Sequence, residues 1–403
     1  MQSNKFNFEL SEILQNVKTL NDFDHIMNDL YKQGVQQLLK AELSHHLGYE
    51  KHSVDGINSG NSRNGSYKKT VRTTQGPIEL DIPRDRNGEF EPKVVPKGQS
   101  TTEKIESVIT SLYSRGMSTD DITVQLQEIY GFEVSKTFIS DITNKMLPAI
   151  HEWQNRPLDD IYYIVWMDCI CFKVRHDSKI VNKSIYIVIG IKTNGVKEIL
   201  GLWMSNTESA AFWLTVLNEL KERGVKKILI ACTDNLTGFT QAIQTAFPNT
   251  VSQLCIVHQI RNSIKFVPWK DRPQFLADLK AVYASLNLES ALIAFETFKE
   301  NWTSKYAYAI KSWEANWANL SPMFDYSPSI RKMMYTTNTV ESVNRAIRKF
   351  TKTKTLFPND QAAMKSVYLA ISQIQNKWTR PIDNWSTIHN EILIIFDNYL
   401  NEV

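Results

Sequence analysis

Apolar positions at helical spacing dominate the first 150 residues, with one exception. Residues 7–48 read as two helices, because their apolar positions recur every three or four residues. Residues 66–97 instead alternate apolar and polar positions, and the turn-forming residues 73–76 predict a hairpin between two strands. Residues 101–147 are helical again and contain two capped helices separated by a glycine-containing turn. Such a pair is typical of a helix-turn-helix DNA reader, although any helical hairpin has the same spacing.

From residue 158 the pattern changes to that of a mixed α/β fold. Three successive strand-like runs, 161–174, 184–191 and 196–204, precede a helix and the apolar strand 228–233. Because this last strand is reached through a helix, we expect it to lie parallel to an earlier strand of the same sheet. Three meandering strands, a helix and a returning parallel strand describe an RNase H-like core, so the predicted fold class is α/β.

Beyond these strands the pattern predicts helices only. Residues 268–328 interrupt the core with three predicted helices: 275–286, 289–306 and 307–320. Three more helices follow residue 328, at about 338–351, 360–377 and 384–400. Three tryptophans of the interruption keep helical spacing, which favours a place in the helical core over stacking on a DNA base: Trp302, Trp313 and Trp317.

Two aspartates stand out within the predicted core. Asp168 lies in a run so apolar, 162–172, that both faces of the strand should be covered. A carboxylate there needs a metal ion or a basic partner, because an uncompensated buried charge costs several kcal/mol. Asp234 directly follows the strand 228–233, at the end where α/β sheets place their ligands, although it could instead cap the next helix. If the two strands are neighbours, Asp168 and Asp234 could share a divalent cation such as Mg²⁺ or Mn²⁺.

Glu341 is the candidate for a third carboxylate of the same site. Its spacing from Asn338 also fits a capping box at the start of a helix, and the two roles can coexist. Four basic residues follow on one helical face: Arg345, Arg348, Lys349 and Lys352. A basic stripe beside a carboxylate suits a substrate with a phosphate backbone, and a solvated surface face is the alternative.

Two further groups of residues are candidates for DNA contact. The predicted hairpin carries a cluster of basic residues: Arg63, Lys68, Lys69 and Arg72. Acidic neighbours such as Glu79 and Asp81 dilute this cluster, so a solvated mixed-charge hairpin is the alternative. The second helix of the predicted helix-turn-helix opens with three polar residues, where such motifs read DNA: Ser135, Lys136 and Thr137.

The cysteines offer two alternative chemistries. Cys255 and His258 have a C-x₂-H spacing, but a structural zinc needs four ligands, usually supplied as two pairs. Cys169 and Cys171 share the strand face opposite Asp168, which predicts buried core thiols rather than metal ligands. A cysteine protease would need a base beside a thiolate, and only His258 is close to a cysteine in sequence. Both alternatives are weaker than the carboxylate site.

Composition narrows the classes of partner. The 403 residues contain 46 Lys plus Arg and 43 Asp plus Glu, so the net charge of +3 excludes a uniformly basic nucleic-acid coat. A polyanion must therefore meet local basic patches. The sequence has no apolar run near the ~20 residues that span a bilayer, and its N-terminus lacks the apolar region of a signal peptide. With four cysteines in so long a chain, we expect a cytoplasmic protein without a disulfide framework.

Short motifs along nearly the whole chain resemble those of a known family. They are Leu112–Thr119; Val165–Asp168 with Lys173–Arg175; Glu208–Ala210 before Trp213; Thr233–Leu236 with Gly238 and Phe239; Gln253, Cys255 and His258 with Ile260–Asn262; and Tyr335–Asn338 with Val340–Ser342, Asn344, Arg348 and Lys349. Together these motifs resemble the transposases of bacterial Mutator-type insertion sequences, relatives of the eukaryotic Mutator-like elements. Each fragment alone is a weak signal, and their combination is highly specific.

The resemblance implies an RNase H-like fold in which Asp168, Asp234 and Glu341 bind two divalent ions, Mg²⁺ or Mn²⁺. These ions would support cleavage at the ends of an insertion sequence and transfer of the cut strand. The implied partners are double-stranded DNA, as terminal inverted repeats and target, and further copies of the chain in a homodimer or higher oligomer. No membrane partner is implied, and the protein would be cytoplasmic, associated with the nucleoid when bound to DNA. Cys255 and His258 match the family's C-x₂-H signature, for which we expect a structural role.

Pattern and resemblance together predict six segments. These are an N-terminal helical region (1–60), a basic β-hairpin region (61–100), a helix-turn-helix DNA-binding region (101–150), the first part of the core (158–267), an all-helical insertion (268–328) and C-terminal helices that complete the catalytic core (329–403). Two other functions remain open at this point. One is an RNase H-like nuclease without strand transfer, and the other is a DNA-binding regulator whose catalytic core is dispensable.

Overall fold

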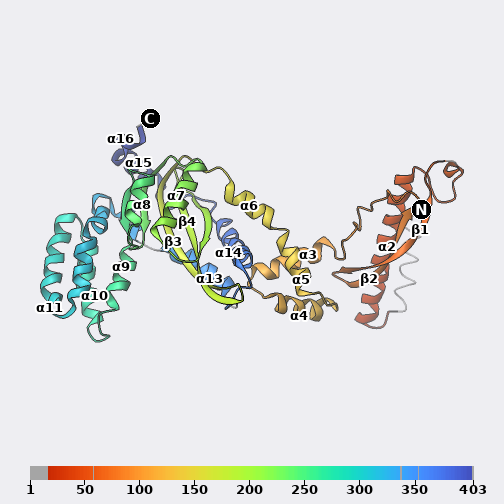
Figure 1. Cartoon of the computed structure of the whole chain (residues 1–403), viewed down its shortest axis with the longest axis horizontal. Coiled ribbons are helices and arrows are strands. Elements are labelled where there is room, and N and C mark those ends of the chain that lie inside the picture. The colour runs from red at the N-terminus through yellow and green to blue at the C-terminus, as the bar shows by residue number, and fades with distance from the viewer. Residues whose placement is uncertain (1–16, 58, 336–337, 353, 402–403) are drawn as a thin grey trace. The chain divides into compact units, whose positions relative to one another are not determined.

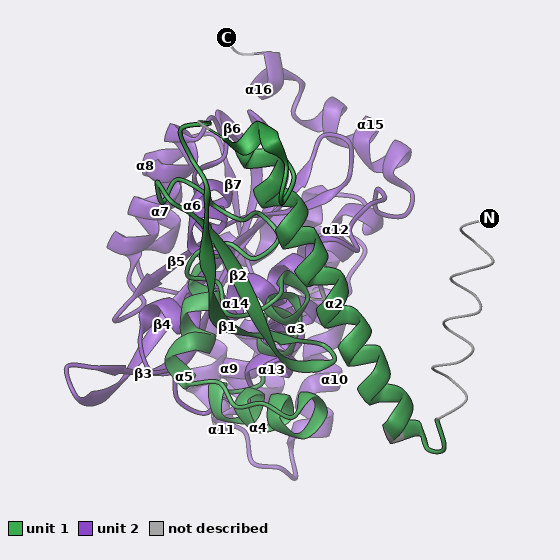
Figure 2. Cartoon of the chain, turned by 90° about the vertical axis from the view of Figure 1, so that its right-hand side faces the viewer, with its two compact units in different colours: residues 1–113, 117–145 green, residues 114–116, 146–403 purple. Residues whose placement is uncertain are grey.

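The computed structural model describes residues 17–57, 59–335, 338–352 and 354–401. The chain forms two compact units, each with its own hydrophobic core (Figure 2). Unit 1 contains residues 1–113 and 117–145, and unit 2 contains residues 114–116 and 146–403. The first of the two helices predicted within residues 7–48 lies outside the described residues.

Unit 1 is built around a long helix packed on a two-stranded hairpin (Figure 1). Its elements are α2 (Leu20–Leu47), the 3₁₀ helix η1 (Val54–Gly56), β1 (Arg63–Thr73), β2 (Gly76–Asp85), α3 (Glu103–Ser114), α4 (Thr119–Tyr130) and α5 (Lys136–Asn144). Helix α2 begins at a capping box between Thr19 and Asp22 and ends at Gly48, whose φ of 79° favours glycine. Its residue Leu39 packs on alternate apolar positions of the antiparallel hairpin: Val71, Ile78, Leu80 and Ile82. The predicted hairpin is therefore confirmed.

The two helices predicted as a helix-turn-helix pair are α4 and α5. Ser118 begins α4 through a capping box with Asp121, and Gly131, with a φ of 70°, ends it. Ser135 caps α5 by accepting a hydrogen bond of 3.1 Å from the backbone N–H of Phe138. The existence and the caps of both helices are thus as predicted, whereas reading of DNA by this pair stays a prediction.

The centre of unit 2 is a five-stranded mixed sheet. Its strands are β3 (Ile161–His176), β4 (Lys179–Lys192), β5 (Lys197–Ser205), β6 (Lys227–Thr233) and β7 (Val251–Leu254), in the order β5-β4-β3-β6-β7. β3, β4 and β5 form an antiparallel meander, and β6 returns parallel to β3, as the sequence predicted. The short strand β7, parallel to β6, was not predicted, because its buried Ser252 and Gln253 interrupt the apolar pattern.

Helices cover both faces of this sheet (Figure 1). One face packs on α7 (Ala210–Glu222) and α8 (Phe239–Ala246). The apolar core on the other face is shared with helices from the rest of unit 2: α9 (Ile256–Ile264), α10 (Arg272–Tyr283), α11 (Leu288–Leu320), η2 (Ser321–Asp325), α12 (Pro328–Tyr335), α13 (Asn338–Thr351), α14 (Asp360–Gln375) and α15 (Trp385–Ile395). Of these, α10 packs mainly on α11 rather than on the sheet. α6 (Leu147–Asn155) precedes the sheet, and α16 (Asp397–Asn401) ends the unit. Both faces of β3 are therefore covered as predicted from Tyr162 to Met167, whereas the strand becomes partly exposed from Asp168 onward.

The helical parts of unit 2 correct several sequence boundaries. The predicted break after Tyr306 is confirmed: α11 consists of two helical segments that meet at this residue, whose backbone is non-helical, with φ −134° and ψ 46°. The predicted helix 384–400 is two helices, α15 and α16, and the predictions missed α6, α9 and α12. Trp302 and Trp313 are buried, so these two tryptophans pack in the helical core as predicted. Among the described residues, we find no helix long and apolar enough to traverse a bilayer.

Candidate active site

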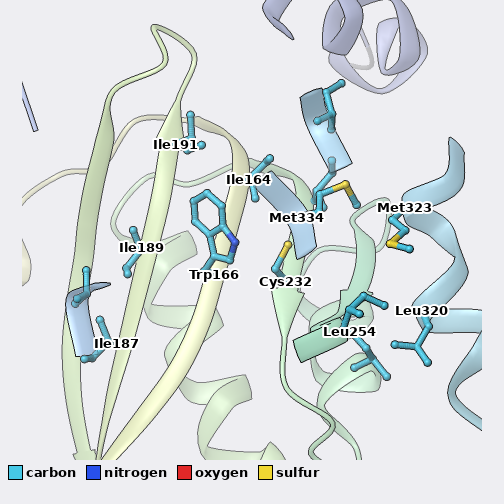
Figure 3. Packing of buried hydrophobic residues seen from close by; sticks show 14 of the residues in the cluster. Ile164, Trp166, Ile187, Ile189, Ile191, Cys232, Leu254, Leu320, Met323 and Met334 are labelled. Carbon is cyan, nitrogen blue, oxygen red and sulfur yellow. The ribbon is translucent and has the colours of Figure 1, made fainter. Parts of the chain in front are cut away.

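Two neighbouring parallel strands bring Asp168 and Asp234 to one place. The parallel pairing of β3 and β6 extends to Trp166 opposite Cys232, and both aspartates lie two residues beyond this pair. Trp166 and Cys232 point to the same side of the sheet, into the core beneath α12 (Figure 3). Because side chains alternate along a strand, Asp168 emerges on this side as well. The condition that the sequence left open, that the two strands are neighbours, is met.

A pocket opens at this end of the strands. It is lined by residues of β3, the end of β6, α9, α12 and α13: Trp166, Met167, Asp168, Cys169, Cys232, Thr233, Asp234, Cys255, His258, Arg261, Met334, Val340, Glu341, Asn344, Arg345 and Arg348. The structure thus gathers the three predicted carboxylates, the C-x₂-H pair and two of the four basic residues that follow Glu341 around one space. These residues span more than 180 positions of the chain, from 166 to 348.

Asp168 is half-buried and held by neutral donors. One carboxylate oxygen, Oδ2, accepts a 2.6 Å hydrogen bond from Asn344 Nδ2, and Oδ1 accepts one of 2.9 Å from the backbone N–H of Cys169. Burial raises the pKa of Asp168, and the bond from Asn344 and the nearby His258 oppose this increase. Among the described residues no Lys or Arg forms an ion pair with Asp168, so the alternative of a buried salt bridge is not realised.

Asp234 does not cap the helix that follows it. α8 begins at Phe239 with Gly238 at its N-cap, and no side chain caps it there, so the capping alternative is wrong. Burial raises the pKa of Asp234 to about 7, and the charges of Glu208 and Asp168 add to the increase. A carboxyl group with such a pKa lies in a site that is short of positive charge.

Glu341 enters the pocket from the first turn of α13. Its carboxylate forms an ion pair with Arg261 of α9, and its side chain is 29% exposed. The side chain of Asn338, the other residue of the predicted capping box, lies outside the described residues. In this arrangement the negative charge of Glu341 is neutralised by Arg261 rather than by a group shared with the two aspartates.

Unsatisfied polar atoms concentrate at the pocket. Within the described part of the chain, four side chains that line it each have a buried atom without a hydrogen-bond partner: Trp166 Nε1, Asp234 Oδ1, His258 Nδ1 and Asn344 Oδ1. Buried polar atoms normally have partners, so this concentration indicates a polar or charged ligand. Carboxylate and amide oxygens are the donors that Mg²⁺ and Mn²⁺ prefer, and the donor set therefore fits such ions.

The basic residues of α13 are exposed. Arg345 and Arg348 line the pocket beside Glu341, Lys349 continues along the same helix, and Lys352 lies just after its last residue, Thr351. Within the described ranges none of the four forms an ion pair. Their charges are therefore free for a polyanion.

The four predicted cations of the hairpin are instead engaged inside unit 1. Arg63 donates to Ser44 Oγ at 2.8 Å and to the Tyr49 carbonyl at 2.9 Å, Lys68 pairs with Glu79 at 2.7 Å, Lys69 donates to the Pro96 carbonyl at 2.8 Å, and Arg72 donates to Ser100 Oγ at 3.4 Å. In α5, Lys136 pairs with Asp120 at 2.8 Å, whereas Thr137 is exposed beside the cap Ser135. DNA contact by these residues stays a prediction.

The cysteines divide into three environments. Cys232 and Cys255 are buried, and Cys169 is half-buried on the face covered by α7 and α8. Cys171 is exposed, so the prediction of a buried thiol at this position is wrong. The reason is that the apolar cluster on this face includes Cys169 but no residue of β3 beyond it. Cys255 is the N-cap residue of α9, directly after β7, and its partner in the motif, His258, lines the same pocket from the first turn of the helix.

Sequence reasoning missed three polar residues of this region. Arg261 and Asn344 contact two of the predicted carboxylates, and Glu208 raises the pKa of both aspartates. All three occur in motifs that carry the family resemblance, but neither charge pattern nor spacing assigned them a role. Their function depends on interactions between residues 26 to 176 positions apart, the shortest separation being that of Glu208 and Asp234 and the longest that of Asp168 and Asn344.

Comparisons with known proteins give sequence matches over nearly the whole chain. The family described as "Transposase, Mutator family" matches residues 1–381. The chain is 41% identical over 374 residues to "Probable transposase for insertion sequence element ISRM3-like" of Sinorhizobium fredii (strain NBRC 101917 / NGR234), covering 93% of each chain. It is equally similar, 41% over 374 residues and 93% of each chain, to "Transposase for insertion sequence element ISRM3" of Rhizobium meliloti (strain 1021). Among solved structures, the Drosophila P element transposase strand transfer complex aligns with 73% of this chain and 86% of that chain at 11% identity, with a TM-score of 0.28, too low to establish a shared fold.

Proposed function

The chain belongs to the Mutator family of transposases, and on that premise we propose that the pocket of unit 2 cuts and joins DNA strands with divalent cations. The protein is a DNA transposase. The observation that carries the finer proposal is the meeting of Asp168, Asp234 and Glu341 in one pocket that also holds free arginines. Hard oxygen ligands and basic side chains together suit a phosphodiester and its metal ions.

Asp168, Asp234 and Glu341 would hold two divalent cations, Mg²⁺ or Mn²⁺. The unpartnered Asp234 Oδ1 and the raised pKa of both aspartates support this assignment, because an added cation would satisfy the oxygen and favour the charged forms. When bound, such ions activate an attacking hydroxyl and stabilise the leaving oxygen of an in-line displacement.

The protein's own side chains would supply positioning and charge. Asn344 holds the Asp168 carboxylate in one orientation through its 2.6 Å hydrogen bond. Arg345 and Arg348, at the rim of the pocket, would bind the non-bridging oxygens of the scissile phosphate and of its neighbours. Hydrolysis of a phosphodiester at an element end leaves a 3′-hydroxyl and a 5′-phosphate. That 3′-hydroxyl then attacks a target phosphodiester and displaces a 3′-oxygen.

The remaining parts of the chain fit this function. We assign the hairpin region 61–100 and the helix-turn-helix region 101–150 to binding of the terminal inverted repeats. The meander, helix and parallel strand of unit 2 favour an RNase H-like core, with 158–267 as its first part, 268–328 as an insertion and 329–403 as its completion. Two element ends must be held together, so we propose a homodimer or a larger assembly.

The test is the Asp168→Asn variant on a duplex that carries an element end. We expect Mg²⁺-dependent cleavage and strand transfer to be abolished, while binding of the duplex stays nearly unchanged. Asp177→Asn is a matched control in the turn after β3, because Asp177 is 91% exposed and far along the strand from the pocket. Cleavage by the Asp168→Asn variant would show that the assigned site is wrong. Cleavage by the native protein without joining of the 3′ end to a second duplex would indicate a nuclease, and binding without either reaction a regulator.

A further inference from the structure

Glu208 is a carboxylate that the fold holds firmly next to the pocket. It lies between the end of β5 and the start of α7, and its two neighbours in sequence are fixed by one tyrosine. The hydroxyl of Tyr186 donates to the Thr207 carbonyl at 2.8 Å and accepts from the backbone N–H of Ser209 at 3.2 Å. Tyr186 is fully buried in β4, opposite Cys169 of β3. The backbone on both sides of Glu208 is therefore anchored to the central sheet.

The Glu208 carboxylate is linked to Asp168 through a single residue. Its Oε2 accepts a hydrogen bond of 2.9 Å from the thiol of Cys169, and its Oε1 accepts one of 3.3 Å from the indole N–H of Trp213. The backbone N–H of the same Cys169 donates to Asp168 Oδ1 at 2.9 Å. Cys169 thus donates to both carboxylates, from its thiol to Glu208 and from its backbone N–H to Asp168.

Both donors to Glu208 are neutral, and its charge has no partner of opposite sign. In the part of the chain that the structure describes, no Lys, Arg or His forms an ion pair with Glu208. Its charge instead adds to that of Asp168 and Asp234, whose pKa values burial and Glu208 both raise. Three neighbouring carboxylates without a cation destabilise one another, and a bound cation removes this cost.

Glu341, by contrast, is already neutralised. Its carboxylate is paired with Arg261, so it adds little negative potential to the site in the absence of DNA. The carboxylate charges at and directly behind the site that lack an ion-pair partner among the described residues are therefore those of Asp168, Asp234 and Glu208.

We infer that Glu208 is a positioning carboxylate of the cation site, which helps Asp168 and Asp234 to hold the first divalent cation before DNA binds. This inference rests on the proposed function, because it assumes that the two aspartates are metal ligands. It assigns Glu341 a later part, after a DNA phosphate has taken over Arg261. Glu208 acts through Asp168 and Cys169 and need not touch the ion itself.

The inference is tested by titrating Mn²⁺ into the DNA-free full-length protein and measuring its dissociation constant by calorimetry. We expect Glu208→Gln to weaken binding of the first ion roughly tenfold, the usual effect of losing a partner behind a metal ligand. Glu341→Gln should change this constant by less than about twofold, because Arg261 already neutralises that charge. Wild-type affinity in Glu208→Gln would overturn the inference, as would an equal loss in Glu341→Gln.

A matched control lies on the same stretch of chain. Glu219 of α7 also accepts an indole N–H, from Trp203 at 2.6 Å, and an amide N–H, from Gln154 at 3.2 Å. It lines no part of the pocket, so Glu219→Gln should bind Mn²⁺ like the wild type. Glu208→Asp keeps the charge and should retain more affinity than Glu208→Gln even if both variants are less stable. Equal losses in these two variants would show a purely structural role and overturn the inference.

Asp168→Asn separates this inference from the proposed function. If Asp168→Asn abolishes Mn²⁺ binding and Glu208→Gln does not affect it, only the inference about Glu208 fails. If Asp168→Asn binds Mn²⁺ normally, the proposed metal site itself is wrong, and the inference fails with it.

Discussion

The basic residues of the hairpin in unit 1 and those of α13 in unit 2 are alike in sequence and different in structure. Both groups contain four cations within a short stretch of chain: Arg63, Lys68, Lys69 and Arg72 in the hairpin, and Arg345, Arg348 and Lys349 in α13 with Lys352 directly after it. Each hairpin cation has a partner inside unit 1. The four cations of the second group are exposed, and within the described residues they form no ion pairs.

The difference shows that the number of charges in a segment does not give the number available to a ligand. In a two-stranded hairpin about half of the side chains point towards other segments of the chain. Long basic side chains in the hairpin therefore form hydrogen bonds and ion pairs with carbonyls and carboxylates of those segments. The exposed face of a helix that begins with an acidic residue and then carries only basic ones offers no such partners. We therefore expect α13 to dominate the electrostatics of the cleavage step, and we expect the hairpin cations to stabilise unit 1 and to contribute little to that step.

Of the variants that test this comparison, the one that removes the two arginines at the pocket should have the largest effect, a loss of cleavage rate. In the Arg345→Ala/Arg348→Ala variant we expect the rate of single-turnover cleavage at saturating DNA to fall roughly a hundredfold, because the developing phosphate charge loses its nearest donors. Quenched-flow or gel assays of an end duplex measure this rate. Lys68→Ala/Lys69→Ala is the matched double variant in the hairpin and should cleave at a rate within about twofold of the wild type. Equal losses in the two double variants would remove the distinction.

Arg63 tests the other side of the comparison. Arg63→Ala removes hydrogen bonds to Ser44 and to the Tyr49 carbonyl, together with a guanidinium 5.0 Å from the centre of the Tyr49 ring. We expect the free energy of opening of the hairpin, measured by amide hydrogen exchange across residues 63–85, to fall by about 2 kcal/mol. Lys68→Ala, which breaks an exposed ion pair, should lower it by less than about 1 kcal/mol. If Arg63→Lys greatly lowered the affinity for DNA while amide hydrogen exchange of the hairpin stayed unchanged, Arg63 would be a DNA contact rather than a stabilising residue.

Replacing Asp85 should have the smallest effect of these variants. It should change the stability of unit 1, by an amount that depends on pH. Burial opposes the ionisation of Asp85, but hydrogen bonds from Asn61 and from the backbone N–H groups of Phe90 and Glu89 lower its pKa to about 2. The folded pKa lies below the unfolded value of about 4, so this stabilisation is present above pH 4 and is lost as the pH falls towards 2.

Asp85→Asn should therefore destabilise unit 1 at pH 7 and less so near pH 2–3. Thermal unfolding of the wild type and the variant across this range measures the difference, and Asp81→Asn, at an exposed position of the same strand, is the control. A constant difference at all pH values would assign the effect to packing.

Three side chains around Asp85 also lie close enough to be considered as metal ligands. His46, Asp85 and Glu89 each place one possible ligand atom within 4.8 Å of the others. Both Asp85 oxygens already accept hydrogen bonds, so we assign the Asp85 carboxylate to holding residues 86–90.

Elements with strong local signals were predicted closely. The helix 338–351 agrees with α13 at both ends, and the meander with its returning strand agrees with β3 to β6. The misses have local causes. β7 is only four residues long and carries a buried glutamine, whose side chain donates to the Leu320 carbonyl at 3.1 Å. The N-cap residue of α9 is Cys255, whose side chain forms no capping hydrogen bond, so no start signal marks this helix.

The sequence predicted which carboxylates belong to the candidate site, but not the contacts that they make with other side chains. An aspartate in an apolar strand and another at a strand end were sufficient to nominate Asp168 and Asp234, because burial of charge needs compensation wherever the strands lie. The position of Glu341 rested on a motif. Nothing local indicated that Arg261 would neutralise Glu341, or that Glu208 would lie behind Cys169.

The sequence by itself determined the strands other than β7, most helices, their caps and the residue types capable of holding a cation. These features depend on interactions between residues that are close in sequence, such as periodic burial and hydrogen bonds at helix ends, so the local sequence is sufficient to predict them. Only the tertiary structure decided which cations stay free, which carboxylate is neutralised and which polar atoms face the pocket without partners. Such outcomes depend on surfaces that meet only after folding, from segments as far apart as residues 168 and 344, where one hydrogen bond or ion pair changes what a side chain can do.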